Sequence, residues 1–188
     1  MKTVYHSALR KEVFTSCECE SKKTDCGEAF VLDITSGVLP KEYDQCDVFY
    51  SEPAWLDGYN IFLERANRSN TSDYDDYLKA LSKIISTGKP TIMIIGKHAI
   101  KHLPKYDGAA DVVLNGYKTN AYSWNCDLCG NFSTNNDLIE YVAKKYDVIG
   151  DFCCGYGNTL KIAKKYGKKC VLSDINKKCI SYITENLL

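Results

Sequence analysis

Short apolar runs alternate along the chain with segments whose apolar residues recur every three or four positions. Runs at residues 29–34, 46–50 and 90–96 predict strands, because they are rich in aliphatic and aromatic residues and are bounded by polar or turn-forming residues. Apolar residues at helical spacing over residues 74–86 predict a helix, which the glycine and proline at 88–90 end. The order strand, helix, strand is typical of a parallel sheet covered by helices.

The same alternation continues to the end of the chain. Strands are predicted at residues 111–114 and 121–124, and Asn115–Gly116 after the first of them predicts a hairpin turn. The remaining predicted elements are helices at residues 138–146, 159–166 and 177–188 and strands at residues 148–151 and 169–174. Together these elements predict an α/β fold with a mainly parallel sheet and helices on both faces.

The composition is that of one domain of ordinary size. The 188 residues are 45% hydrophobic and 26% charged, which is enough for a substantial core but not for a second full domain. We expect residues 29–188 to form this domain, and residues 1–28 to be a separate, flap-like segment because residues 16–27 are polar and weakly patterned. The 24 basic and 24 acidic residues cancel, so only local basic surface can attract nucleic acid.

The cellular compartment follows from two features that the chain lacks. No apolar run reaches 18 residues, and the first residues have no apolar core of the kind that signal peptides carry. We therefore expect a soluble protein without membrane contact, located in the cytoplasm, or in the host-cell cytoplasm if a phage encodes it.

Ten cysteines are many for a chain of this length. In the cytoplasm they are expected to be reduced, and four that lie within or beside apolar runs are expected to pack as small core residues: Cys153, Cys154, Cys170 and Cys179. A zinc site is the alternative for a second group, in which only CDLC has a complete CxxC spacing. Its members are Cys17, Cys19, Cys26, Cys126 and Cys129.

A glycine-containing turn follows the predicted strand at 148–151, where the chain reads DFCCGYGN. Gly155 and Gly157 allow the backbone to turn sharply and to approach a ligand closely. Asp174, at the end of the next predicted strand, is placed to accept hydrogen bonds from ribose hydroxyls. Such a turn fits NAD, FAD or S-adenosylmethionine, but Leu160 stands where a dinucleotide-binding motif has its third glycine.

A second candidate segment, SEPAW at residues 51–55, follows the predicted strand at 46–50. It combines an acid, a proline and a large aromatic residue at a strand's carboxyl end, where a flat base can be held. Because ligands bind at the carboxyl ends of strands in open α/β sheets, we expect this segment and the glycine turn to meet at one edge.

The segment Glu52, Pro53, Ala54 and Trp55 resembles the catalytic segment of the amino-methyltransferases. These enzymes transfer a methyl group from S-adenosylmethionine to the exocyclic nitrogen of adenine or cytosine. Their segment has Asp, Asn or Ser, then two prolines, then Tyr, Phe or Trp. Glu52 is one methylene longer than the usual Asp, and Ala54 replaces the second proline.

Two further segments carry the same resemblance, which spans residues 29–188. Asp151, Gly155 and Gly157 resemble the cofactor loop of the family, and VLSDIN at residues 171–176 resembles its ribose-binding strand end. Because the catalytic segment precedes the cofactor loop, the order is similar to that of the circularly permuted, beta-type members.

The resemblance implies a circularly permuted, Rossmann-like class I methyltransferase fold that acts on DNA, with adenine N6 favoured over cytosine N4. Glu52 and the carbonyl of Pro53 would accept hydrogen bonds from the amino group, and Trp55 would stack on an extruded base. No metal and no cysteine nucleophile are implied, because an exocyclic amine can attack directly. The implied S-adenosylmethionine-binding residues are Asp151, Phe152, Gly155, Gly157, Asn158, Thr159, Asp174 and Ile175.

Three alternatives remain at this point. The departures at Glu52 and Ala54 are compatible with a non-catalytic subunit or binding module that retains the fold. The acceptor of an active enzyme could instead be RNA or protein, and a nicotinamide-dependent oxidoreductase is the weakest alternative.

Target selection is expected to be weak in this chain alone. The interval from Gly96 to Asn135 is too short for a target-recognition insert, so selectivity should be low or come from a second copy or a partner subunit. Arg65 and Arg68 lie in a polar stretch that runs to Asp76 and is expected to be a mobile loop, for which contact with nucleic acid is the less favoured of two interpretations. His98 and His102 are expected to be a surface pair rather than metal ligands.

Overall fold

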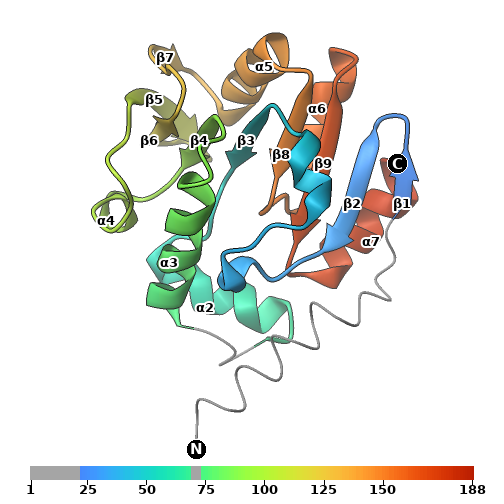
Figure 1. Cartoon of the computed structure of the whole chain (residues 1–188), viewed down its shortest axis with the longest axis horizontal. Coiled ribbons are helices and arrows are strands. Elements are labelled where there is room, and N and C mark those ends of the chain that lie inside the picture. The colour runs from blue at the N-terminus through green and yellow to red at the C-terminus, as the bar shows by residue number, and fades with distance from the viewer. Residues whose placement is uncertain (1–21, 69–72) are drawn as a thin grey trace, which may run out of the picture.

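Nine strands form one mixed sheet in the computed structural model, which describes residues 22–68 and 73–188 (Figure 1). From one edge to the other they are β1 (Lys22–Thr24), β2 (Gly27–Val31), β9 (Lys169–Asp174), β8 (Val148–Asp151), β3 (Val48–Ser51), β4 (Thr91–Ile94), β6 (Tyr117–Trp124), β5 (Gly108–Leu114) and β7 (Asn131–Phe132). The strands from β2 to β4 in this order are parallel to one another, whereas β1 and β6 are antiparallel to their neighbours. The predicted mainly parallel α/β fold is therefore confirmed.

Helices cover both faces of this sheet. They are α2 (Leu56–Arg65), α3 (Tyr74–Ile85), α4 (Lys97–Ile100), α5 (Asn135–Lys145), α6 (Asn158–Lys165) and α7 (Lys177–Asn186), with short 3-10 turns η1 (Ile34–Ser36) and η2 (Lys41–Gln45). Side chains of α5, α6 and α7 share one hydrophobic core, and those of α2, α3 and α4 share another. None of the helices in the described ranges combines the length and the apolar character needed to cross a membrane.

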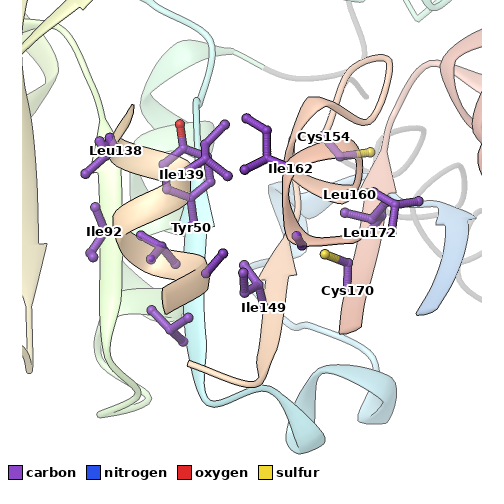
Figure 2. Close-up of a cluster of buried hydrophobic side chains, with 14 of the residues drawn as sticks. Tyr50, Ile92, Leu138, Ile139, Ile149, Cys154, Leu160, Ile162, Cys170 and Leu172 are labelled. Carbon is purple, nitrogen blue, oxygen red and sulfur yellow. The ribbon is translucent and has the colours of Figure 1, made fainter. Parts of the chain in front are cut away.

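The strands alternate their side chains between the two cores. In β4, Ile92 and Ile94 belong to the core under α5 and α6, whereas Met93 belongs to the core under α3. This period of two explains why the apolar run is continuous, since a strand buried on both faces needs apolar residues at every position. Figure 2 shows the first core, in which Tyr50 of β3 lies beside Ile139 of α5.

The hairpin predicted at Asn115–Gly116 is confirmed, and its turn lines the cavity that is described below. Asn115 and Gly116 have φ angles of 51° and 84°, which are the left-handed values that a tight two-residue hairpin turn requires. Strand β5 is paired with β6 along its whole length, from Gly108 with Ser123 to Leu114 with Tyr117.

Two predictions near the amino-terminal side were wrong. Residues 22–28 are not a separate flap, because β1 and β2 form a hairpin that pairs with β9 at the sheet edge. The strand predicted at 29–34 ends at Val31, since the Asp33 carboxylate accepts a hydrogen bond from the Thr35 amide and caps η1. The expected flap-like character of residues 1–21 lies outside the described residues.

A third correction concerns the segment after the SEPAW sequence. Residues 56–65 form α2, so Arg65 lies in the last turn of a helix and not in a loop. Arg68 lies beyond this helix, and residues 69–72 lie outside the described part of the chain. The proposed nucleic-acid loop is therefore shorter than expected from the sequence.

Candidate active site

The SEPAW segment and the glycine turn meet at the carboxyl edge of the sheet, as predicted. Strands β3 and β8 are parallel neighbours, and Ser51 Oγ donates a hydrogen bond of 2.9 Å to Asp151 Oδ1 across 100 positions of sequence. Strands β9 and β2 end at the same edge, because both run parallel to β8. The turns that follow these four strands surround one cavity of about 660 Å³. Its volume is typical of small-molecule sites, roughly 300–1,000 Å³.

Most of the residues that the sequence singled out line this cavity. They are Glu52, Asp151, Phe152, Gly155, Asn158, Thr159, Asp174 and Ile175. Pro53, Trp55 and Gly157 do not line it. Pro53 is buried. Trp55 is 38% exposed and lies over Gly96, the N-cap of α4, where an added Cβ would be 3.6 Å from the indole. Trp55 is therefore beside the cavity rather than in its wall.

Glu52 is the first residue after β3, and its carboxyl group is largely buried in the cavity wall. Burial raises the pKa of this carboxyl group above its usual range, because the charged form loses solvation. Two donors oppose that shift: the hydroxyl of Tyr50, 3.2 Å from Oε1, and the side-chain amide of Asn135 at the start of α5. The arrangement provides a hydrogen-bond acceptor that lines the cavity while the protein holds it in place.

The backbone around Glu52 is fixed by tyrosines of α3. The amide of Ala54 donates a hydrogen bond of 2.9 Å to the Tyr77 hydroxyl, and the Tyr74 hydroxyl donates one of 3.4 Å to the Ala54 carbonyl. Tyr77 is buried and itself lines the cavity. Ala54, which replaces the second proline of the family segment, is thus restrained by hydrogen bonding, and its amide is a donor that proline lacks.

Asp151 connects the SEPAW segment and the glycine turn through hydrogen bonds. Its carboxylate accepts hydrogen bonds from Ser51 Oγ at 2.9 Å, from Thr159 Oγ1 at 2.6 Å and from the Cys153 amide at 3.1 Å. These donors come from the end of β3, the start of α6 and the glycine turn. Even so, burial raises the pKa of Asp151 to about 7, because the loss of hydration outweighs the three hydrogen bonds.

A pH dependence of stability follows from this group. Between about pH 4, where the unfolded carboxyl ionises, and about pH 7, the folded protein binds the extra proton, so the Asp151 contribution to stability should be lost as pH rises. We expect the difference in unfolding free energy between the unmodified protein and an Asp151→Asn variant to fall by at most about 1.4 kcal/mol per pH unit. Urea unfolding across this range measures the difference, and a constant difference would contradict the prediction.

Asp174 and Gly155 form the other side of the cavity. The Gly155 amide donates a hydrogen bond of 2.9 Å to Asp174 Oδ2, and the Asn176 amide donates one of 2.8 Å to Oδ1. Burial raises the pKa of Asp174, and both amides oppose this shift. Gly155 has a φ of 49°, and a Cβ added there would meet no protein atom within 4 Å. The turn therefore leaves open space in the cavity beside a carboxylate of fixed orientation.

Gly157 does not line the cavity, and its role is to allow close packing of α7. It is the N-cap of α6 with a φ of 75°, and an added Cβ would lie 2.9 Å from Leu187 and 3.0 Å from Ile183 of α7. The glycine that the sequence assigned to cofactor binding thus allows close approach of α7.

Replacing Gly157 with alanine is expected to lower the unfolding free energy by about 2–3 kcal/mol, from left-handed strain and from the side-chain contacts. Gly167→Ala is the matched control, because Gly167 has a φ of 65° but open space around it. The control should lose only the backbone part, about 1–2 kcal/mol. Equal losses in denaturant unfolding would refute the packing explanation.

Several cavity residues were not identified as site residues from the sequence. Asn135 and Asn136 both line the cavity, and Asn158 Nδ2 donates to Asn136 Oδ1 at 2.9 Å. Asp33 and Thr35, after β2, line it as well. The sequence could have identified Asp33 and Thr35, because polar residues that follow a parallel strand lie at the edge of the sheet where ligands bind. The other lining residues that were missed are Leu32, Ile34, Tyr59, Phe62, Leu63, Tyr77, Val113, Leu114, Asn115, Gly116 and Thr134.

The five-cysteine zinc site is not supported. Cys26 lies in the β1–β2 turn at one edge of the sheet, whereas Cys126 follows β6 near the opposite edge. In the described ranges no group of three or more histidine, cysteine or acidic side chains could hold a metal, and Cys17 and Cys19 lie outside these ranges. Cys154, Cys170 and Cys179 are buried as predicted, whereas Cys153 is half-buried; Cys153 and Cys154 both line the cavity.

Comparison of sequences finds no matching family model and no matching curated protein. Comparison of structures finds clear similarity. The chain superposes on the M1.HpyAVI–SAM complex with a TM-score of 0.53 and 11% identity, covering 86% of this chain and 98% of that one. It superposes on PvuII DNA methyltransferase, which is cytosine-N4-specific, with a TM-score of 0.54 and 9% identity, covering 85% and 86%.

A third similar structure is TTHA0409 from Thermus thermophilus, complexed with S-adenosyl-L-methionine. Its TM-score is 0.50 at 11% identity, and the match covers 82% of this chain and 90% of that one. The superpositions span nearly the whole of each chain, but at such low identity they establish the architecture alone. The chain therefore has the Rossmann-like α/β fold that these structures share.

Proposed function

We propose that this protein is an S-adenosylmethionine-dependent methyltransferase that acts on an exocyclic amino group of a DNA base. The observation that carries the proposal is that Glu52 and Asp174 line one cavity, with the glycine turn between their strands. Two of the similar structures contain S-adenosylmethionine, and a third is named as a DNA methyltransferase. An acceptor for an amino group and an acceptor for ribose hydroxyls thus face the same space.

The residues present fit S-adenosylmethionine. The open space at Gly155 admits a ligand close to the backbone, and the Asp174 carboxylate can accept hydrogen bonds from ribose hydroxyls. Phe152 and Ile175 provide apolar surface in the same cavity, and Asn158 and Thr159 provide polar groups at the start of α6. Leu160 is fully buried in the core under α6, so the close approach that a third glycine gives a dinucleotide site is absent.

When bound, S-adenosylmethionine supplies a methyl group on a positively charged sulfur. The chain's own contribution is to orient the nucleophile: Glu52 would accept one hydrogen of the base amino group. The carbonyl of Pro53, which lies between the lining residues Glu52 and Ala54 without itself lining the cavity, would accept the other. Because the accepting form of Glu52 is ionised and burial raises its pKa, activity should increase with pH on the acidic side. Trp55, half-exposed beside the cavity, would stack on the extruded base.

The order of the elements supports a circularly permuted arrangement. The strand β3, which leads into the proposed catalytic segment, precedes β8 in sequence but lies directly beside it in the sheet. Residues 97–132 form α4, β5, β6 and β7, with the hairpin tip at Asn115 and Gly116 lining the cavity. We therefore propose one methyltransferase domain without a separate recognition domain, so that sequence selection is low or comes from a second copy or a partner subunit.

The test is methyl transfer from isotope-labelled S-adenosylmethionine to duplex DNA, single-stranded DNA, RNA and a protein extract. Nucleoside mass spectrometry identifies the product. N6-methyladenine in DNA is the expected product, and N4-methylcytosine would retain the DNA enzyme while changing its target base. Label only in RNA or protein would refute the DNA substrate. No transfer by protein that binds the cofactor would favour a non-catalytic subunit.

A further inference from the structure

Three side chains form a closed hydrogen-bond network at the base of Glu52. The Tyr50 hydroxyl lies within hydrogen-bond distance of Glu52 Oε1, at 3.2 Å, and of Asn135 Oδ1. Asn135 Nδ2 donates to Glu52 Oε1. Tyr50 and Glu52 flank Ser51 on and after β3, but Asn135 comes from α5, 83 positions later than Glu52. Tyr50 is held in place by burial beneath α5 (Figure 2).

The direction of these hydrogen bonds matches an ionised Glu52. The Tyr50 hydroxyl has one hydrogen, which it can direct to Glu52 Oε1 or to Asn135 Oδ1, and in either case the Asn135 amide presents its N–H group to the carboxylate. The opposite orientation of the amide would place two acceptor oxygens against each other. The network therefore supplies a donor at the place where a buried carboxylate needs one.

Only one oxygen of Glu52 is used by this network. Both of its hydrogen bonds end on Oε1, and within the described part of the chain Oε2 has no partner. Glu52 and Asn135 line the cavity, so Oε2 is the acceptor that a ligand can use. A glutamate is one methylene longer than the aspartate of the resembling segment, and without a tether its extra torsion angle would let the carboxylate swing.

We propose that Asn135 is a positioning residue that holds Oε1 of Glu52 and thereby presents Oε2 to the amino group of the target base. This inference rests on the proposed function for the identity of the ligand. The position of Asn135 makes the role separable from helix formation. Thr134, not Asn135, caps α5, through a reciprocal pair of hydrogen bonds with Asp137. Replacing Asn135 therefore removes the tether and leaves the cap.

Within the described residues, the titratable groups that interact electrostatically with Glu52 are Tyr50 of its own strand and Asp151 at the end of β8, while α5 contributes the uncharged Asn135. Burial keeps the pKa of Tyr50 well above its usual value, so Tyr50 stays neutral near neutral pH. The Asp151 carboxyl titrates near pH 7 and must be distinguished from Glu52 in any titration.

The first experiment measures the ionisation of Glu52 directly. Carboxyl carbon NMR titration of the full chain, with Glu52→Gln and Asp151→Asn variants to assign the signals, gives the pKa of Glu52. The Asn135→Ala variant should raise that pKa, because the ionised form loses a donor. The matched control is Asn120→Ala, which removes an exposed amide-to-carboxylate hydrogen bond of 2.8 Å to Asp111; both residues belong to the β5–β6 hairpin, but neither lines the cavity. An unchanged Glu52 pKa in Asn135→Ala would overturn the proposal.

The second experiment tests geometry through a compensating pair. Glu52→Asp retracts the carboxyl group by roughly 1.5 Å, so it should lower kcat by about tenfold to a hundredfold although it restores the family residue. Asn135→Gln extends the tether by the same length, and the double variant should recover activity and the acidic limb of the pH profile. Wild-type activity of Glu52→Asp, or no recovery in the double variant, would refute the positioning role.

The two experiments also separate this inference from the proposed function. If the unmodified chain transfers no methyl group to any acceptor, the proposed function fails. The NMR titration still decides whether Asn135 controls the ionisation of Glu52. If methyl transfer occurs but neither the pKa nor the acidic limb responds to Asn135, the function stands and the inference fails.

Discussion

Replacing Glu52 with glutamine is expected to lower the rate of methyl transfer by about two to four orders of magnitude while cofactor affinity stays nearly unchanged. Glutamine keeps the length of the side chain but replaces one carboxylate oxygen by an N–H donor, which cannot accept a hydrogen bond from the base amino group. Glu52 does not share a hydrogen bond with Asp174 or the glycine turn, so the ribose side of the cavity is preserved. Single-turnover kinetics and isothermal titration with S-adenosylmethionine measure the two quantities separately.

The control for this variant is Glu64→Gln, which makes the same chemical change on the exposed face of α2. It should leave both the rate and the affinity unaltered. A Glu52→Gln protein that retains wild-type activity would remove Glu52 from the proposed chemistry. A loss of cofactor affinity equal to the loss of rate would indicate that Glu52 binds the cofactor instead of the base.

Replacing Asp174 with alanine is expected to weaken S-adenosylmethionine binding by about 3 kcal/mol, roughly a hundredfold in Kd. The carboxylate is proposed to accept hydrogen bonds from the ribose, and it also holds the Gly155 amide at 2.9 Å, so its removal affects both the acceptor and the turn. The rate at saturating cofactor should fall much less than in Glu52→Gln, because Asp174 lies on the cofactor side. Titration calorimetry gives the affinity, and circular dichroism confirms that the fold is retained.

Asp107→Ala is the matched control for Asp174. Its carboxylate also accepts a backbone hydrogen bond, 2.7 Å from the Asn125 amide, but it lies on an exposed turn away from the cavity. Its loss should not change cofactor affinity. If Asp174→Ala binds S-adenosylmethionine as tightly as the unmodified chain, the ribose contact is wrong and the cavity holds a different ligand or a different pose.

Local sequence patterns predicted most elements correctly and failed where packing overrides periodicity. The helix α2 was missed because its apolar residues point to both sides: Tyr59 and Leu63 are buried, whereas Ile61 and Phe62 are about half exposed, 47% and 49%. The end of β2 was placed too late because Ile34 is apolar and buried, although it belongs to η1.

The cavity residues also divide into those that local sequence could identify and those that only packing brings to the site. Glu52, Gly155 and Asp174 could be found from sequence, because each stands at or just after the carboxyl end of a predicted parallel strand. Asn135 could not be assigned to the site in this way. It begins a helix on a different part of the chain, and its type and position are those of an ordinary helix-initiating residue.

By itself the sequence determined the α/β alternation, the two segments that carry the chemistry, and the edge at which they meet. Periods of two and of about 3.6 residues are local properties, and parallel strands connected by helices end at the same edge. Only the tertiary structure decided which side chains complete the site. Sheet order sets β3 beside β8, so that Asp151 joins both segments, and the packing of α5 on β3 brings Asn135 to Glu52. These contacts join residues many positions apart, and no local pattern specifies them.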